Sequence, residues 1–257
     1  MPPPVLCATF NAMQTKDVPQ TPPPHPQQVE TWLFDLDNTL YPASCRLFDQ
    51  IDRRMGLFIE QRFGLSSEAA RHMQKSFFHT HGTTLRGLMT EHAVDPADYL
   101  DFVHDIDLSG LEADSRLDAA LSALPGRKVI FTNADTGHAE RVLDRLALAH
   151  HFEAIFDIRA AEFVPKPDEG PYDRLLERHG LAAERTVFFE DSARNLKPAH
   201  ARGMTTVWVR HEANWSAPPP RTTTSTIAPT TLRPGCRPST PETADFLLSA
   251  VASSGGD

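Results

Sequence analysis

The sequence predicts an α/β fold: a doubly wound, mainly parallel sheet, with a separate helical bundle inserted after the first strand. Short apolar runs that suit buried strands alternate with stretches whose apolar residues recur at helical spacing. Residues 41–125 lie between the first two apolar runs. A parallel crossover needs only about a dozen residues, so this segment is expected to pack as a unit of its own.

The first expected strand is Trp32 to Phe34, and two carboxylates one residue apart, Asp35 and Asp37, follow it. Its apolar run suits a strand buried on both faces. Open α/β sheets bind ligands at the carboxyl ends of their strands, so both acids are candidates for a functional site. A solvated turn is the alternative interpretation, because Asp also favours turns.

The inserted residues 41–125 are expected to form a bundle of four helices. Apolar residues at helical spacing predict a first helix from Phe48 to Phe63, which Gly64 ends. The three further helices are expected to begin at typical capping residues: Ser66, Thr83 or Thr84, and Asp95. The aromatic and methionine residues of the bundle are interpreted as core rather than as ligand contacts.

The rest of the chain alternates strands with helices. Further strands are expected to begin at Lys128, Ile155, Thr186 and Thr205. Helices are expected from about Gly137 to Leu148, from Pro171 to His179, and from a cap at Asn195, with Pro198 in the first turn, to Gly203.

Polar residues follow these strands in a specific order. Thr132-Asn133 ends the second strand, Lys166 lies between two prolines, and Glu190-Asp191 ends the strand that begins at Thr186. Together with Asp35-x-Asp37-x-Thr39, this order resembles the haloacid dehalogenase superfamily of phosphotransferases. The resemblance extends from Trp32 to about His211, and four motifs in order are far more specific than one. It implies a Rossmann-like core with a helical cap domain.

The resemblance implies a role for each acid in phosphate-ester hydrolysis. Asp35 would attack phosphorus and form an aspartyl phosphate. Asp37 would protonate the leaving oxygen and then activate water, and the nearby Asp35 would help to keep a proton on it. Asp35, the carbonyl group of Asp37, and Asp191 would hold Mg²⁺, which prefers carboxylates, water and phosphate oxygens.

The other motif residues would bind or position the phosphate. Thr132 and Asn133 would contact the phosphoryl oxygens, Lys166 would neutralise negative charge, and Glu190 would orient water or Lys166. Each has a simpler interpretation when taken singly. Lys166 could be a solvated loop residue, Thr132 a strand-end cap, and Glu190-Asp191 the cap of the next helix.

Two stretches, residues 34–42 and 81–88, are similar to the pyrimidine 5′-nucleotidase group within the superfamily. They imply a nucleoside monophosphate substrate, with Thr83 and Thr84 contacting its sugar or base and Arg86 attracting the anion. His81 departs from the group, which more often has an aromatic residue there. Thr83 or Thr84 could instead only cap a helix. Among the 12 histidines no metal-ligand pattern is visible, and His79, His81 and His92 are interpreted as surface or cap-lining residues.

Other functions stay open on these residues. The alternatives are a phosphatase of sugar phosphates or other small metabolites, a phosphomutase, a dehalogenase, and a catalytically idle phosphate-binding module. The dehalogenase branch uses a strand-end Asp but needs neither a metal nor a second Asp, so Asp37 and Glu190-Asp191 favour the phosphatase branch. An idle module would be expected to lack at least one key residue, and none is missing.

Composition limits the setting. A net charge of −9 argues against nucleic-acid binding, and no apolar window reaches the ~18 residues of a membrane span. No basic residue precedes the apolar patch near the N-terminus, so a signal peptide is not expected. The three cysteines suggest neither a disulfide framework nor a zinc site. We expect a cytoplasmic enzyme, a monomer or homodimer, whose partner is a small phosphorylated metabolite.

The expected domain organisation has four parts. Residues 1–28 are expected to be a disordered segment, residues 29–40 and 126–216 the core, and residues 41–125 the cap. Residues 217–257 are rich in proline and threonine and are expected to be a disordered tail with a short terminal helix. A shifted reading frame near Ala217 is the alternative explanation of that tail.

Overall fold

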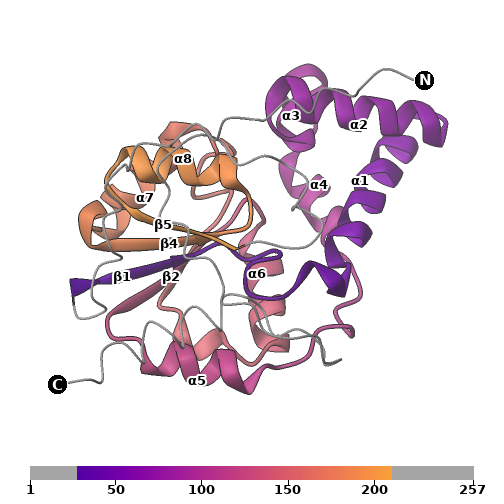
Figure 1. Ribbon diagram of the computed structural model, residues 1–257. Helices are drawn as coiled ribbons and strands as arrows, with labels where there is room; N and C mark the ends of the chain where they lie inside the picture. Colours follow the sequence, from indigo (N-terminus) through magenta and orange to yellow (C-terminus); the bar gives the residue numbers. More distant parts are fainter. Residues whose placement is uncertain (1–27, 210–257) are drawn as a thin grey trace, which may run out of the picture.

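The computed structural model describes residues 28–209 (Figure 1). The expectations for the chain ends, including the disordered segments, the terminal helix and the shifted reading frame, lie outside the described residues. Within the described range, no helix combines the length and the apolar character needed to cross a membrane.

The centre of the fold is a five-stranded sheet in the order β3-β2-β1-β4-β5, in which every neighbouring pair is parallel. The strands are β1 (Thr31–Phe34), β2 (Arg127–Phe131), β3 (Ala154–Phe156), β4 (Thr186–Glu190) and β5 (Thr205–Trp208). The predicted parallel α/β fold is therefore confirmed. The strand that precedes Asp35 lies in the middle, so its carboxyl end is flanked by the ends of β2 and β4.

Helices cover both faces of this sheet, as Figure 1 shows for α5 below it and for α7 and α8 above it. Because side chains alternate along a strand, Phe34 belongs to one apolar cluster with α5 and α6, whereas Leu33 belongs to another with α7 and α8. The four helices are α5 (Ser115–Ala123), α6 (Thr136–Arg145), α7 (Glu169–His179) and α8 (Ala193–Ala201). Within the described residues, the connections also contain the short 3-10 helices η2 (Ala43–Cys45), η3 (Ala149–His151) and η4 (Ala183–Arg185).

Four further helices form a bundle beside the carboxyl end of the sheet (Figure 1). They are α1 (Leu47–Phe63), α2 (Ser67–His81), α3 (Thr84–His92) and α4 (Pro96–Val103). The predicted caps of the last three are confirmed, because the side chains of Ser66, Thr83 and Asp95 each accept a backbone N–H of the first turn. Their buried side chains form a separate cluster, which includes Phe58, Phe77 and Tyr99.

The helix α5 lies within residues 41–125 but packs on the sheet. Leu117 and Leu121 share an apolar cluster with Phe34 and Ile130, and Leu111 belongs to the same cluster. The division of the chain into cap and core at residue 125 remains a prediction. This packing favours a cap that ends before Leu111.

The start of α8 differs from the prediction. The helix begins at Ala193 rather than after Asn195, and Asn195 lies inside it with its carbonyl oxygen accepting the Tyr172 hydroxyl at 2.6 Å. The chain turns directly after β4, where Glu190 Oε1 accepts the N–H of Ser192 at 3.1 Å. That side-chain bond to the backbone starts the turn earlier than the Asn and Pro signals indicated.

Candidate active site

Three carboxylates meet at the carboxyl ends of the two central strands. Asp35 follows β1, and its N–H donates to Phe189 O at 2.9 Å, so the pairing of β1 with β4 extends to this residue. Glu190 ends β4, and Asp191 follows it. Oxygens of Asp35, Glu190 and Asp191 all lie within 4.8 Å of one another. The parallel pairing thus brings together acids that lie far apart in the sequence.

Lys166 binds two of these acids. Its Nζ lies 2.8 Å from Asp35 Oδ1, 2.7 Å from Glu190 Oε2 and 2.6 Å from the carbonyl oxygen of Phe131. An ammonium group has three donors, so all three are used. The side chain is only 1% exposed, and it is therefore not the solvated loop lysine of the alternative interpretation.

Asn133 holds the loop that carries this lysine. Its amide nitrogen donates to Lys166 O at 3.2 Å, and its amide oxygen accepts Lys166 N–H at 2.8 Å. The buried Thr132 hydroxyl accepts the N–H of Ala134 at 3.0 Å. Contact of Thr132 and Asn133 with a phosphate remains a prediction. The contacts seen here favour Asn133 as the residue that positions Lys166.

The acidic cluster has too little positive charge of its own. Burial, and then the charge of Glu190, raise the pKa of Asp35 to about 7, against the opposing effect of Lys166. Burial, followed by the charges of Glu190 and Asp35, raises the pKa of Asp191 to about 9. Both shifts arise first from burial, and the repulsion among three carboxylates that share one lysine adds to them. A divalent cation bound by carboxylate oxygens would offset this repulsion, so the donor set fits Mg²⁺.

Asp37 lies in a different environment. Its Oδ1 accepts the Tyr41 hydroxyl at 2.5 Å and lies 3.0 Å from His138 Nε2. Burial alone would raise the pKa of Asp37, but the charge of His138 and the hydrogen bonds from His138 and Tyr41 lower this pKa to about 2. The expectation that Asp35 keeps a proton on Asp37 is therefore wrong for this structure, because nearer hydrogen-bond donors determine the charge of Asp37.

His138 belongs to a buried chain of polar groups that the sequence analysis missed. Asp135 caps α6, with Oδ1 accepting His138 N–H at 2.9 Å, and its Oδ2 is hydrogen-bonded to His104 Nδ1. The rings of His104 and His138 stack with centroids 4.4 Å apart. His104 directly follows α4, so this chain of polar groups joins the cap to the environment of Asp37. A capping Asp three residues before a His, directly after a strand, is the signal that could have revealed it.

The two candidate threonines of the cap are used within the cap. Thr83 Oγ1 accepts Arg86 N–H at 3.2 Å, so Thr83 caps α3, as the alternative interpretation of this residue expected. The buried Thr84 hydroxyl donates to Gln74 O at 3.3 Å. A Cβ at Gly87 would lie 2.4 Å from the Phe77 ring, so this glycine permits close packing of α2 and α3. These contacts do not favour substrate recognition by Thr83 or Thr84.

Two contacts tie the cap to the core beside the acidic cluster. Arg86 of α3 forms an ion pair with Asp168, two residues after Lys166. The guanidinium of Arg194, three residues after Asp191, lies 4.8 Å from the ring centre of Phe78 in α2. Phe78 is 38% exposed. The cap thus contacts the loop that carries Lys166, through Asp168, and the helix that follows Asp191, through Arg194.

Comparison with known proteins agrees with this arrangement. The sequence-family model of the haloacid dehalogenase-like hydrolases matches residues 29–203. This range contains every residue of the acidic cluster. The chain belongs to this hydrolase family. It is 26% identical over 204 residues to "Phosphate metabolism protein 8" of Saccharomyces cerevisiae, an alignment that covers 73% of this chain and 63% of that relative. The chain thus spans less than two thirds of that relative's length.

A solved structure extends the likeness to the fold of this family member. The HAD phosphatase from Thermococcus onnurineus matches with a TM-score of 0.52 and 15% sequence identity, over 77% of this chain and 92% of that one. At this identity the likeness concerns the fold alone.

Proposed function

We propose that this hydrolase is a Mg²⁺-dependent phosphatase that acts through an aspartyl-phosphate intermediate. The observation that carries the proposal is the contact of Lys166 Nζ with both Asp35 and Glu190, next to Asp191. A nucleophilic carboxylate, a buried cation and a cation-binding pair of acids are what phosphoryl transfer needs in one place. The names of the Saccharomyces relative and of the Thermococcus structure, one linked to phosphate metabolism and one a phosphatase, support the same reaction class.

Asp35 is the proposed nucleophile. One of its oxygens forms a bond to phosphorus while the bond from phosphorus to the ester oxygen breaks. Lys166 holds Asp35 Oδ1 at 2.8 Å, and the hydroxyl of Thr39 holds Oδ2 at 3.2 Å. These two hydrogen bonds orient the carboxylate in the folded protein, so little further entropy is lost when it aligns for attack on phosphorus.

Asp37 is the proposed acid and base. It gives a proton to the leaving alkoxide in the first step and takes one from the attacking water in the second, which releases inorganic phosphate and restores Asp35. Tyr41 and His138 both bind Asp37 at Oδ1, so we assign the proton transfer to Oδ2. We assign His138 a positioning role, because its Nε2 lies 3.0 Å from Oδ1 and holds the carboxyl group that transfers the proton at Oδ2.

Asp35, Asp191 and the carbonyl group of Asp37 would hold the metal ion, and Glu190 would orient Lys166. When bound, Mg²⁺ supplies positive charge that offsets the phosphoryl oxygens and the crowded carboxylates. Asp191 is held in place for this role by its own backbone, since its carbonyl oxygen accepts Trp208 Nε1–H at 2.8 Å.

We further propose a nucleoside monophosphate as substrate, with a pyrimidine preferred. The similarity of residues 34–42 and 81–88 to the pyrimidine 5′-nucleotidase group supports this choice. The half-exposed ring of Phe78 beside Arg194 adds a surface on which a base could stack. A phosphatase of sugar phosphates is the alternative within the same mechanism.

The test is phosphate release from p-nitrophenyl phosphate with Mg²⁺ and with a chelator, followed by kcat/KM for UMP, CMP, AMP, GMP and several sugar phosphates. Turnover that needs Mg²⁺ is expected, with the pyrimidine nucleotides turned over most efficiently. A sugar phosphate that exceeds every nucleotide by tenfold would overturn the nucleotide proposal alone. Metal-independent release of chloride from 2-chloropropionate, without phosphatase activity, would replace the phosphatase proposal by the dehalogenase alternative.

A further inference from the structure

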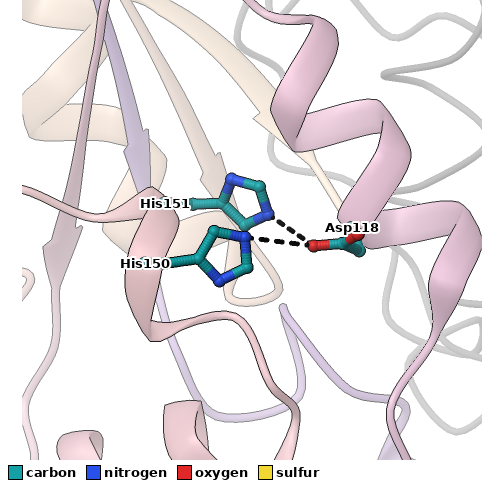
Figure 2. Close-up of side chains that lie close together, drawn as sticks. All are labelled: Asp118, His150 and His151. Carbon is teal, nitrogen blue, oxygen red and sulfur yellow. Dashed lines mark hydrogen bonds and ion pairs between the residues drawn. The ribbon is translucent and has the colours of Figure 1, made fainter.

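A second cluster of metal-ligating side chains lies outside the candidate active site. It consists of Asp118 in the first turn of α5, with His150 and His151 at the end of η3 (Figure 2). Glu153, two residues after the histidines, donates its N–H to Lys128 O at the start of β2. The cluster therefore lies toward the amino ends of β2 and β3, whereas Asp35 lies beyond the carboxyl end of β1. No step of the proposed reaction uses it.

The three side chains converge on one point. His151 Nε2 lies 2.8 Å and His150 Nε2 lies 3.3 Å from the same oxygen, Asp118 Oδ1. Neighbouring residues of a 3-10 helix point about 120° apart, because the helix has about three residues per turn. Figure 2 shows that both rings nevertheless turn their Nε2 atoms toward Asp118. The ring centroids of the two histidines are 3.9 Å apart.

One of these two separations matches a small tetrahedral metal site, and the other is a direct hydrogen-bond contact. Zinc–ligand distances of about 2.0–2.1 Å give about 3.3 Å between two ligands of a tetrahedron. The separation of His150 Nε2 from Asp118 Oδ1 already has this value, and that of His151 is half an ångström shorter. All three donor atoms lie within 4.8 Å of one another, so small side-chain rotations bring them to one ion.

We propose that Asp118, His150 and His151 bind a divalent transition metal, with Zn²⁺ as the best match. Two imidazoles and one carboxylate suit Zn²⁺, whereas Mg²⁺ prefers oxygen ligands only. An imidazole binds a metal ion through the lone pair of a ring nitrogen, and both rings turn Nε2 toward the Asp118 carboxylate. Water fills the fourth position, since the side chains of His150 and Asp118 are 63% and 45% exposed.

The ion links two segments that the chain separates by a strand and a helix. The side chain of His151 is only 6% exposed, so this ligand is fixed in place by its surroundings. Asp118 belongs to α5, the helix that packs on Phe34. Binding in the folded state alone stabilises that state in proportion to the logarithm of the free metal concentration. The effect of Zn²⁺ at this site is therefore on stability, and it is separate from the Mg²⁺ requirement of the reaction.

The experiment uses the full chain without a polyhistidine tag, titrated with Co²⁺ in the presence of excess Mg²⁺ to occupy the acidic cluster. Tetrahedral Co²⁺ gives strong visible absorption, whereas octahedral Co²⁺ absorbs weakly. We expect a strong spectrum at one equivalent, its displacement by Zn²⁺, and a rise of several degrees in Tm with Zn²⁺. Loss of an outer partner of a metal ligand typically costs about 10–100-fold in affinity, so loss of a direct ligand should cost at least as much.

The variants His150→Ala, His151→Ala and Asp118→Asn should each weaken Co²⁺ binding at least tenfold. His72→Ala, an exposed histidine of α2, is the matched control and should bind as the wild type does. If His151→Ala does not fold, His150→Ala still tests metal binding at this site, because the side chain of His150 is mostly exposed. An unchanged strong spectrum in His150→Ala, or only weak octahedral absorption in the wild type, would overturn the proposal.

Discussion

His138 Nε2 lies 3.0 Å from Asp37 Oδ1, although the two residues are 101 positions apart in the chain. The contact forms because β1 and β2 are parallel neighbours, so the turn after β1 faces the helix that follows β2. It makes the proposed acid of this hydrolase part of a pair whose second member is a fully buried imidazole.

Replacement of His138 should impair protonation of the leaving group. In His138→Asn we expect kcat for an alkyl phosphate to fall by about tenfold or more, because proton transfer by a positioned group contributes roughly 10²–10⁴-fold. The loss for p-nitrophenyl phosphate should be much smaller, since its leaving group needs little protonation. The measurement is kcat and KM for both substrates, together with Tm.

His138→Gln is the conservative variant for this test, because its side-chain amide can donate to Asp37 in place of the imidazole. It should recover part of the activity on the alkyl phosphate. His72→Asn is the surface control. Equal losses on both substrates would assign His138 a merely structural role.

Asp35→Asn should abolish phosphatase activity and leave the fold intact. The amide is a poor nucleophile and a poor metal ligand, and it replaces a carboxylate whose pKa is already raised to about 7 by burial and by Glu190. We therefore expect Tm to change little. Phosphate release and thermal unfolding are the two measurements, and activity within tenfold of the wild type would rule out covalent catalysis by Asp35.

Lys166→Met should lower stability as well as activity. The variant leaves the three carboxylates without their lysine, and breaking a buried ion pair costs about 3–5 kcal/mol. For a domain of this size, that loss lowers Tm by roughly 10 °C. Added Mg²⁺ should restore part of it, because the cation offsets the same repulsion.

The control for Lys166→Met is Lys197→Met, which changes an exposed lysine of α8 and should keep the wild-type Tm. Thermal unfolding with and without Mg²⁺ compares the two variants. An unchanged Tm in Lys166→Met would contradict the view that the lysine holds the acidic cluster together.

Asp135 should stabilise the protein in a pH-dependent way. Burial would raise its pKa, but the hydrogen bond with His104, the charge of His104 and the N–H of His138 hold the pKa of this carboxyl well below its usual range. A depressed pKa contributes stability that is fully present above the unfolded value of about 3.9 and is lost as the pH falls below it. Asp135→Asn keeps the helix cap but lacks this charge.

We expect the Tm of Asp135→Asn to lie below that of the wild type at pH 5, with the gap narrowing as the pH falls through about 3.9. Thermal melts from pH 6 to pH 3 measure both proteins. A gap that persists unchanged to pH 3 would show that the charge of Asp135 does not contribute to stability.

Local sequence patterns were sufficient for the elements of the fold. The apolar runs predicted the five strands, and Ser66, Thr83 and Asp95 predicted three helix starts, because capping needs only a side chain and the backbone two or three residues later. The start of α8 was misplaced because Glu190, a residue outside that helix, holds the turn that begins it. The cap boundary at residue 125 rested on chain length, which does not show that α5 packs on the sheet.

The sequence by itself determined the fold class, the family resemblance and the positions of the acids that follow the strands. A buried strand and the polar residues at its end occupy consecutive positions, so a local pattern is enough to predict them. Only the tertiary structure decided which side chains work together. Lys166 is joined to Asp35 across 131 positions, and His138 to Asp37 across 101. Asp118 meets His150 and His151 in the same way. Such contacts depend on the order of strands in the sheet and on helix packing, and no local pattern carries that information.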